Sequence, residues 1–369
     1  MTLQNETISG VSEDAVENLA ILELRPAFER QTSSFSAAWS GLVGGTMPPR
    51  WWTPDLLIPG DALELYSTDD AYYVPSLGAV LTAGGQIFLT TARHATYIDP
   101  KLEQLQQIWS TRASAPRLTD GIVTMSWGSQ HNYGHFVLDA MTSVAAVAEL
   151  AIDWQVPFVT PPLREWQRQH FKLLQIEPLE LAEPIYAFGH IAFVSGMKGS
   201  LHNPNLHFQT LRDAQLSWLP AAAGGAQRIY ISRRGHKRPL INEDKLEQAL
   251  ESIGFAIIHT ENLPIAEQIE TFRNASIIVA PTGAALANLL YAQRATVFEI
   301  IPRDMTLSDT AHKWVAFLTA MGEGDWRPFF CEDSPESEQA EIAGQKQPGY
   351  RAFELSIPDL LSFIAPALA

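Results

Sequence analysis

A histidine and an aspartate stand four residues apart in the segment His131-Asn-Tyr-Gly-His-Phe-Val-Leu-Asp139. Asn132 is a residue type that caps helices, so we expect a helix to begin just after it. On that helix His135 and Asp139 share one face. Because a carboxylate beside an imidazole orients the ring and raises its basicity, this pair can remove the proton of a hydroxyl group.

Two other interpretations of these residues stay open. His131 and His135 have a spacing that metal ligands use, but the His-Glu-x-x-His pattern is missing and His131 precedes the cap. His135 can also be a buried histidine with a purely structural role. We expect no metal and no cofactor. Either His135 or Asp139 can be the base, and we favour His135 oriented by Asp139, because histidine titrates near neutral pH and aspartate is a weak base.

A second group of candidate residues follows strands expected in the C-terminal half. The strand 228–232 leads into a basic run, 233–238, and the strand 276–280 leads into Pro281-Thr-Gly-Ala284. Carboxyl ends of parallel strands lie on one edge of a sheet, so both segments are expected there. Arginine binds phosphate oxygens in pairs and a helix start offers free N–H groups, so a diphosphate fits between them.

The next strand carries Glu299 near its end, where it can accept hydrogen bonds from ribose hydroxyls. Each of these features also has a plainer explanation. A basic run is commonly a solvated loop, Thr282 and Gly283 can be a simple helix cap, and Glu299 can pair with Arg303. Their shared position at one edge of the expected sheet is what favours a ligand site.

Alternating strands and helices position both groups, which predicts an α/β fold with parallel sheets covered by helices. The small-residue segment 221–226 predicts a domain boundary. We expect an N-terminal α/β domain over 1–220 with an irregular N-terminal extension, a Rossmann-like domain over 221–345 and a helical tail over 346–369. The expected strands are 122–125, 156–159, 191–194, 228–232, 255–259, 276–280 and 296–300, and the expected helices are 133–150, 163–174, 243–253, 264–274 and 284–291.

Composition limits the partners. The 369 residues carry a formal net charge of −16, which would repel a nucleic acid. The single cysteine allows no internal disulfide. The N-terminus lacks the features of a signal peptide and no apolar run is long enough to span a membrane, so we expect a cytoplasmic protein. Peripheral membrane contact stays open, and the oligomeric state is not indicated.

Three segments in this order resemble glycosyltransferase family 61. The first is Asn132-Tyr-Gly-His-Phe-Val-Leu-Asp139, the second is Ser232-Arg-Arg followed by Arg238-x-x-x-Asn242-Glu243, and the third is Ala280-Pro-Thr-Gly-Ala-Ala-Leu-Ala-Asn288. Glu299-Ile300 then follows. Phe136 stands where the family usually has tryptophan, and Thr282 where it usually has histidine.

The resemblance implies a GT-B architecture, meaning two Rossmann-like domains with a nucleotide-sugar donor held mainly by the C-terminal one. It also implies inverting, metal-independent transfer to a hydroxyl of a glycan or other acceptor, with bacterial relatives acting around surface polysaccharides. Two other functions fit: a catalytically inactive binding protein, which Thr282 favours, and a nucleotide-sugar epimerase. The implied site residues are His135 and Asp139 for catalysis, Asn132 and Tyr133 on the acceptor side, and Arg233, Arg234, Arg238, Thr282, Gly283, Ala284, Asn288 and Glu299 for the donor and its phosphates.

Overall fold

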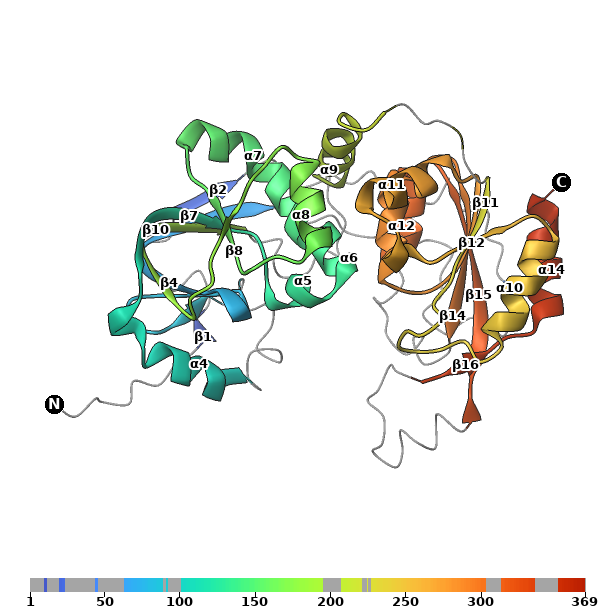
Figure 1. Cartoon of the computed structure of the whole chain (residues 1–369), viewed down its shortest axis with the longest axis horizontal. Helices are drawn as coiled ribbons and strands as arrows, with labels where there is room; N and C mark the ends of the chain where they lie inside the picture. Colours follow the sequence, from blue (N-terminus) through green and yellow to red (C-terminus); the bar gives the residue numbers. More distant parts are fainter. Residues whose placement is uncertain are drawn as a thin grey trace. The chain divides into compact units, whose positions relative to one another are not determined.

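The computed structural model describes residues 10–11, 20–23, 44–45, 63–88, 91, 101–194, 207–220, 224, 227–302, 313–335 and 351–368. They form two compact units, of which one ends at Leu219 and the other begins its main segment at Pro220. Each unit has its own sheet with helices packed against it (Figure 1). The expected α/β class is therefore confirmed. The expected linker 221–226, apart from residue 224, and Arg303 lie outside the described residues.

The sheet of the first unit is mixed. It consists of β1 (Gly10–Val11), β2 (Ala20–Glu23), β4 (Glu64–Val74), β5 (Ala79–Leu81), β6 (Ile87–Phe88), β7 (Arg117–Val123), β8 (Phe158–Thr160), β9 (Leu179–Glu180) and β10 (Tyr186–Val194). The strands β10, β7, β8 and β9 are parallel neighbours, as the alternating pattern predicted for three of them. On the other side of β10 the long strand β4 runs antiparallel, and β2 and β5 pair with it in the same sense. The pairs of this other half are antiparallel except for β1 and β6, which are parallel.

Helices pack against this sheet. They are α4 (Leu102–Trp109), α5 (Trp127–His131), α6 (Tyr133–His135), the π-helix η5 (Phe136–Met141), α7 (Thr142–Trp154), α8 (Glu165–Lys172) and α9 (His207–Leu216). The helix expected over 133–150 is present as the succession α6, η5 and α7. All six residues of η5 are buried, so this π-helical segment lies inside the unit. A π-helical turn within an α-helix is often found at a functional site.

The sheet of the second unit is almost entirely parallel. Its strands are β3 (Gly44–Gly45), β11 (Arg228–Ile231), β12 (Ala256–Ile258), β13 (Ile277–Pro281), β14 (Thr296–Pro302), β15 (Asp325–Asp333) and β16 (Phe353–Glu354). The order is β12-β11-β13-β14-β15-β16, with β3 also paired to β15. Only β16 is antiparallel to its neighbour. The chain leaves β11 on one side to form β12 and returns on the other to form β13, so the strand order reverses between β11 and β13.

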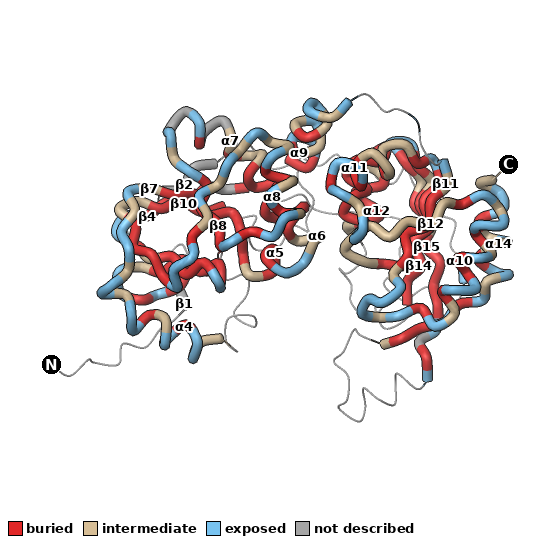
Figure 2. The backbone as a smooth tube through the Cα atoms, viewed as in Figure 1, coloured by how far each residue is buried: buried red, intermediate tan, exposed pale blue. Residues whose placement is uncertain are grey.

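Helices cover both faces of the second sheet. They are α10 (Glu243–Ser252), the 3-10 turn η7 (Thr260–Asn262), α11 (Ile265–Asn274), the 3-10 helix η8 (Ala284–Tyr291), α12 (Lys313–Met321) and α14 (Ile357–Ile364). In Figure 1, α10 and α14 lie on one face and α11 and α12 on the other. Figure 2 shows the buried strands between them. None of the helices that the structure describes is long and apolar enough to cross a membrane.

Two short strands extend this unit beyond the expected boundaries. Gly44–Gly45, from the expected N-terminal domain, pairs with Phe329 and Phe330 of β15. Phe353–Glu354, from the expected tail, pairs with Glu332 and Asp333 at the end of the same strand. The reason is burial, because Phe353, Leu360 and Ile364 pack into the core beneath the sheet. Residues 351–368 therefore belong to the second unit rather than forming a separate tail.

The core of the second unit generates a stability prediction. Leu246 is fully buried on the face of α10 that meets Tyr230 and Val279 of the sheet. Leu246→Ala should lower the free energy of unfolding by about 2–5 kcal/mol, because it removes buried methyl groups and leaves a cavity. Urea unfolding measures this change. Exposed Lys245, the neighbouring residue, provides the control, since Lys245→Ala should stay within about 0.5 kcal/mol of the unmodified protein.

Candidate functional site

The His135–Asp139 pair is formed in the first unit. Nδ1 of His135 lies 2.8 Å from Oδ2 of Asp139, and the side chain of Asp139 is only 1% exposed whereas that of His135 is 12% exposed. Oδ1 of Asn132 accepts a hydrogen bond from the backbone N–H of His135, as expected for a residue that caps the helix. The carboxylate is thus enclosed and the imidazole partly open to solvent.

The orientation of the pair fixes which ring nitrogen can act on a substrate. When Nδ1 of His135 carries the hydrogen, it donates to Asp139 and leaves the lone pair on Nε2. The backbone around the carboxylate is also held, because Oγ of Ser143 donates to the carbonyl oxygen of Asp139 at 2.7 Å. Such an imidazole can accept a proton from a hydroxyl group that reaches its exposed edge.

An aromatic cluster supports the start of this helix. The ring of Tyr133 lies 5.5 Å from that of Trp166 and 5.8 Å from that of His170, measured between centroids. Phe136 meets the same two rings at 4.9 Å and 5.6 Å. The position where the family resemblance expects tryptophan is therefore a packing position, which a phenylalanine fills. Tyr133, expected on the acceptor side, keeps part of its surface exposed.

His170, at the base of this cluster, is a histidine that remains neutral. It is fully buried, and burial lowers its pKa to about 3. Its Nδ1 lies 3.2 Å from Nε2 of Gln215, which also donates to the carbonyl oxygen of His170. Since the ring cannot take up a proton near neutral pH, it is a packing element of the site and not a proton carrier.

The second candidate group lies at the carboxyl end of β11, beside the point where the strand order reverses. Arg233 turns back over the sheet edge, and its guanidinium donates to the carbonyl oxygens of Thr282 and Lys237. None of the ion pairs among the described residues includes Arg233. Burial, followed by the charge of Arg238, lowers the pKa of Arg233 to about 10, so it stays a cation at neutral pH. It is a half-buried charge whose hydrogen bonds go to neutral carbonyl groups.

The close approach of Arg233 to the end of β13 depends on Gly283. A methyl group at this position would stand closer to Nη1 of Arg233 than real Cβ atoms come to other heavy atoms. The backbone of Gly283 is extended, so the glycine is needed for space and not for an unusual conformation. Ala284 follows as the first residue of η8, whose leading N–H groups have no partner within the helix. Thr282 itself is buried, with its N–H bonded to the carbonyl of Ile300.

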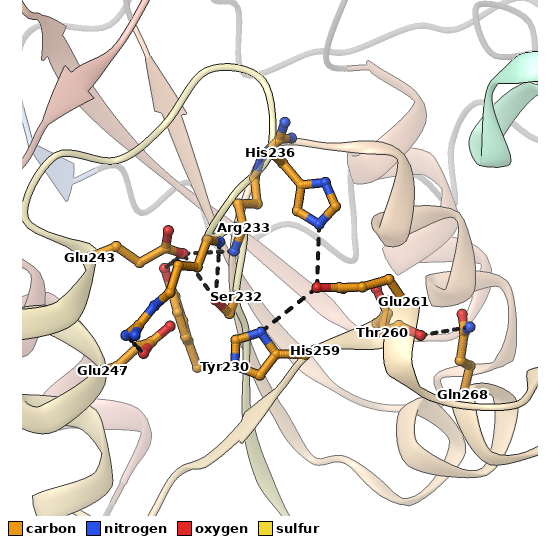
Figure 3. Close-up of polar contacts among 11 residues, drawn as sticks. Tyr230, Ser232, Arg233, His236, Glu243, Glu247, His259, Thr260, Glu261 and Gln268 are labelled. Carbon is orange, nitrogen blue, oxygen red and sulfur yellow. Dashed lines mark hydrogen bonds and ion pairs between the residues drawn. The ribbon is translucent and has the colours of Figure 1, made fainter.

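Carboxylates of α10 hold the loop that carries these arginines (Figure 3). Buried Glu243 accepts hydrogen bonds from the backbone N–H of Arg233 at 2.7 Å and from Oη of Tyr230 at 2.9 Å. Arg234 instead pairs through its guanidinium with Asp244 and Glu247. The charge of Arg234 is compensated by two carboxylates, so of the two adjacent arginines Arg233 is the better candidate for an anion.

Two expected donor contacts fall inside the unit rather than on its edge. Asn288 is fully buried in η8, where its amide donates to Oε1 of Gln268 at 3.1 Å. Glu299 is fully buried within β14, opposite Ala280, and accepts a hydrogen bond from Nε1 of Trp326 at 3.0 Å. Because it lies within the strand and out of reach of solvent, Glu299 is not placed for the expected ribose contact.

A polar cluster that the sequence reasoning did not assign lies at the end of β12. Oε1 of Glu261 is 3.4 Å from Nε2 of His236 and 3.9 Å from Nδ1 of His259. Figure 3 shows the two imidazoles on either side of the carboxylate. Its position directly after a parallel strand was the signal that could have identified it. Glu243 was equally unassigned, although it belongs to the segment that carries the family resemblance.

Comparison with known proteins bears on both groups of residues. Residues 133–298 match the model of the family described as Glycosyltransferase 61. The match begins at Tyr133, spans the His135–Asp139 pair and the Arg233 loop, and ends inside β14. It supports a glycosyltransferase enzyme, which implies a donor and an acceptor substrate. A search of curated proteins found no significant match.

His131 lies outside the matched residues, which begin at Tyr133. Within the described part of the chain, no group of three or more histidine, cysteine, aspartate or glutamate residues is arranged to hold a metal ion. His131 lies instead beside Trp127, with 5.0 Å between the ring centroids.

The neutral, buried His170 predicts a pH dependence of stability. Its pKa is lower in the folded protein than the unfolded value of about 6.5, so below pH 6.5 the unfolded chain binds a proton that the folded chain does not. This contribution to stability is complete above pH 6.5 and is lost as the pH falls toward 3. At pH 5 the loss should be about 2 kcal/mol.

Urea unfolding at pH 7 and pH 5 measures this loss. His170→Gln should reduce the difference between the two pH values by about that amount. Exposed His190, which pairs with Asp69, serves as control, because His190→Gln should leave most of the difference in place. An unchanged pH dependence in His170→Gln would contradict the neutral buried state.

Proposed function

We propose that this protein is an inverting glycosyltransferase that moves a sugar from a nucleoside diphosphate donor to a hydroxyl group of a glycan acceptor without a metal ion. The second unit binds the donor, and the His135–Asp139 pair of the first unit activates the acceptor. The family match supports the reaction class. The finer assignments follow from the chemistry of the two groups of residues.

The observation that carries the donor assignment is the half-buried guanidinium of Arg233. A cation removed from water is costly unless an anion or several hydrogen bonds compensate it. Arg233 has two carbonyl partners, at the place where doubly wound sheets bind their ligands. The start of η8 adds N–H groups and a positive helix end beside it. A diphosphate would supply an anion in direct contact with the guanidinium, whose own hydrogen bonds go to carbonyl groups.

The same groups would stabilise the leaving group. As the bond between the anomeric carbon and the diphosphate oxygen breaks, its electron pair passes to the diphosphate and negative charge grows there. A fixed cation and fixed N–H groups stabilise that charge more strongly than they stabilise the bound donor. This supports departure of the diphosphate without a metal ion. Arg238, in the same loop, adds positive charge near Arg233.

The acceptor step uses His135. Its Nε2 takes the proton of the acceptor hydroxyl, and the hydroxyl oxygen attacks the anomeric carbon from the side opposite the leaving group. One bond forms and one breaks in a single displacement, so the configuration at that carbon inverts. Asp139 orients the ring and stabilises the imidazolium that forms, because its enclosed carboxylate lies 2.8 Å from Nδ1.

The GT-B description fits the second unit better than the first. The second has a parallel sheet with helices on both faces, which suits a donor domain. The first has a mixed sheet, so we assign it to the acceptor by its His135–Asp139 pair and not by its topology. Bacterial surface polysaccharides are the acceptor class that the family resemblance indicates.

The base assignment predicts a specific loss of transfer. His135→Ala and Asp139→Asn should each lower kcat about 10²–10⁴-fold, since both remove general-base assistance. Donor binding should be unchanged, because these residues belong to the acceptor step. Transfer assays with radiolabelled sugar, combined with calorimetric titration of the donor, measure the two quantities.

His131→Ala is the matched control, since His131 ends the preceding helix α5 and is exposed. It should retain transfer. Full activity in both His135→Ala and Asp139→Asn would remove the proposed base, and release of free sugar or epimerised donor without an acceptor would contradict the transferase assignment.

The donor assignment predicts that space at Gly283 controls nucleotide affinity. Gly283→Ala should displace the guanidinium of Arg233 and weaken binding of a nucleoside diphosphate about tenfold or more. Thermal shift against UDP, GDP, CDP and ADP measures this, because a ligand of the folded state raises the midpoint.

Gly84→Ala provides the control, since a methyl group there would meet only the hydroxyl of Thr82 at 3.7 Å. It should keep the nucleotide shift of the unmodified protein. Unchanged nucleotide affinity in Gly283→Ala would contradict the role of Arg233 in donor binding.

A further inference from the structure

The strand order of the second unit singles out the end of β12. The diphosphate site proposed above lies where β11 and β13 end, and β12 is the neighbour of β11 on the other side. In dinucleotide-binding folds, the strand that follows the phosphate-binding strand ends in an acidic residue that accepts hydrogen bonds from the ribose. Here that position is occupied by Glu261, in the turn η7 directly after β12.

Glu261 has the exposure that Glu299 lacks. Its side chain is 40% exposed, and both of its contacts, with His236 and His259, fall on Oε1. At 3.4 Å and 3.9 Å these contacts are longer than the charge-assisted bonds of about 2.7–2.9 Å that imidazolium and carboxylate groups form. Oε2 has no bond from any residue that the structure describes. The carboxylate can therefore accept further hydrogen bonds.

The cluster faces the diphosphate loop. His236 belongs to the same turn as Arg233, and the N–H of His236 donates to the carbonyl oxygen of Arg233 at 3.0 Å. Figure 3 shows the imidazole of His236 reaching from this turn to Glu261. A nucleotide whose phosphates bind Arg233 would thus have its ribose within the neighbourhood of the carboxylate.

The segment that carries Glu261 is also fixed. Nε2 of Gln268 donates to the carbonyl oxygens of Thr260 and Leu263, on either side of it. Oε1 of the same Gln268 accepts from Asn288 in η8, the helix that begins next to Arg233. These bonds give the buried Asn288 a role: it ties the end of β12 to the helix at the diphosphate site. A fixed carboxylate loses little entropy when it binds a diol.

We propose that Glu261 binds the ribose 2′- and 3′-hydroxyls of the donor and thereby selects ribonucleoside diphosphates over their 2′-deoxy counterparts. The assignment rests on the proposed donor site. A vicinal diol can donate both of its hydrogens to one carboxylate, and removal of the 2′-hydroxyl leaves a charged acceptor with one bond fewer. Position, exposure and orientation thus favour Glu261 over Glu299 for this contact.

Calorimetric titration with matched pairs tests the proposal: UDP and dUDP, GDP and dGDP, CDP and dCDP, ADP and dADP. The unmodified protein should bind the ribonucleotide of its preferred pair about tenfold or more tightly than the deoxynucleotide. Glu261→Ala should bring that ratio close to one by weakening only the ribonucleotide. The exposed Glu267, one turn into α11, supplies the control Glu267→Ala, which should keep the ratio.

A second variant separates ribose binding from a purely structural role of the cluster. His236→Ala removes the contact between the loop and Glu261 but leaves the carboxylate, so the preference for ribose should survive. If Glu261 acted only by holding the loop, both variants would weaken ribo- and deoxynucleotides equally, which would overturn the proposal. Nucleotide binding with a ratio near one in the unmodified protein would overturn it while leaving the donor site in place. Absence of all nucleoside diphosphate binding would contradict both the ribose contact and the donor site.

Discussion

The second unit is organised around a half-buried cation whose hydrogen bonds go to neutral groups. The guanidinium of Arg233 reaches across the edge of the sheet from β11 to β13 and bonds to carbonyl oxygens of Thr282 and Lys237. Carbonyl dipoles recover part of the hydration energy that burial removes, but they do not neutralise the charge. The protein as a whole is strongly acidic, so no general field would bring an anion to this place. The binding energy for an anionic ligand must come from this local arrangement.

Arg233 can keep this position only if its loop is rigid. Carboxylates of α10 hold that loop in place. Glu243 receives the backbone N–H of Arg233 and the hydroxyl of Tyr230, and burial keeps that phenol protonated by raising its pKa well above 10. Arg234 forms ion pairs with Asp244 and Glu247 of the same helix. Two adjacent arginines therefore have opposite roles. One anchors the loop to the helix, and the other keeps its charge available at the edge of the sheet.

Sequence reasoning located the elements that follow a clear period and missed those that do not. Helices 243–252 and 265–274 and the strands around Arg228, Ile277 and Thr296 have regular apolar spacing, and they lie within a residue or two of the expected bounds. The strand β15 was missed because Pro328 interrupts it and charged residues end it, although it pairs along its length with β14. The strand β4 carries Ser67-Thr-Asp-Asp70 in its middle, which hides its place at the centre of the first sheet.

At the candidate site, the spacing of residues along the sequence predicted which side chains meet. Their burial could not be predicted in this way. The interval from His135 to Asp139 set their contact because one turn of helix brings such residues together, even with the π-helical segment between them. The positions of Arg233 and Thr282 followed from the rule that parallel strands end on one edge. The burial of Glu299 and Asn288 could not be predicted from the sequence, because it involves contacts with residues far along the chain. Glu299 contacts Trp326, and Asn288 contacts Gln268.

Thr282 differs from the histidine expected by the glycosyltransferase 61 resemblance, and the same contact gives a physical explanation for the difference. Arg233 bonds to the backbone carbonyl of Thr282, which every residue type supplies, while the side chain of Thr282 is buried. A threonine in place of histidine therefore keeps the bond that holds the guanidinium across the sheet edge. The residue type at position 283 is more restricted, because any side chain there would occupy the space that the guanidinium fills. The position of the guanidinium thus depends on the absence of a side chain at Gly283 and not on the side chain of Thr282.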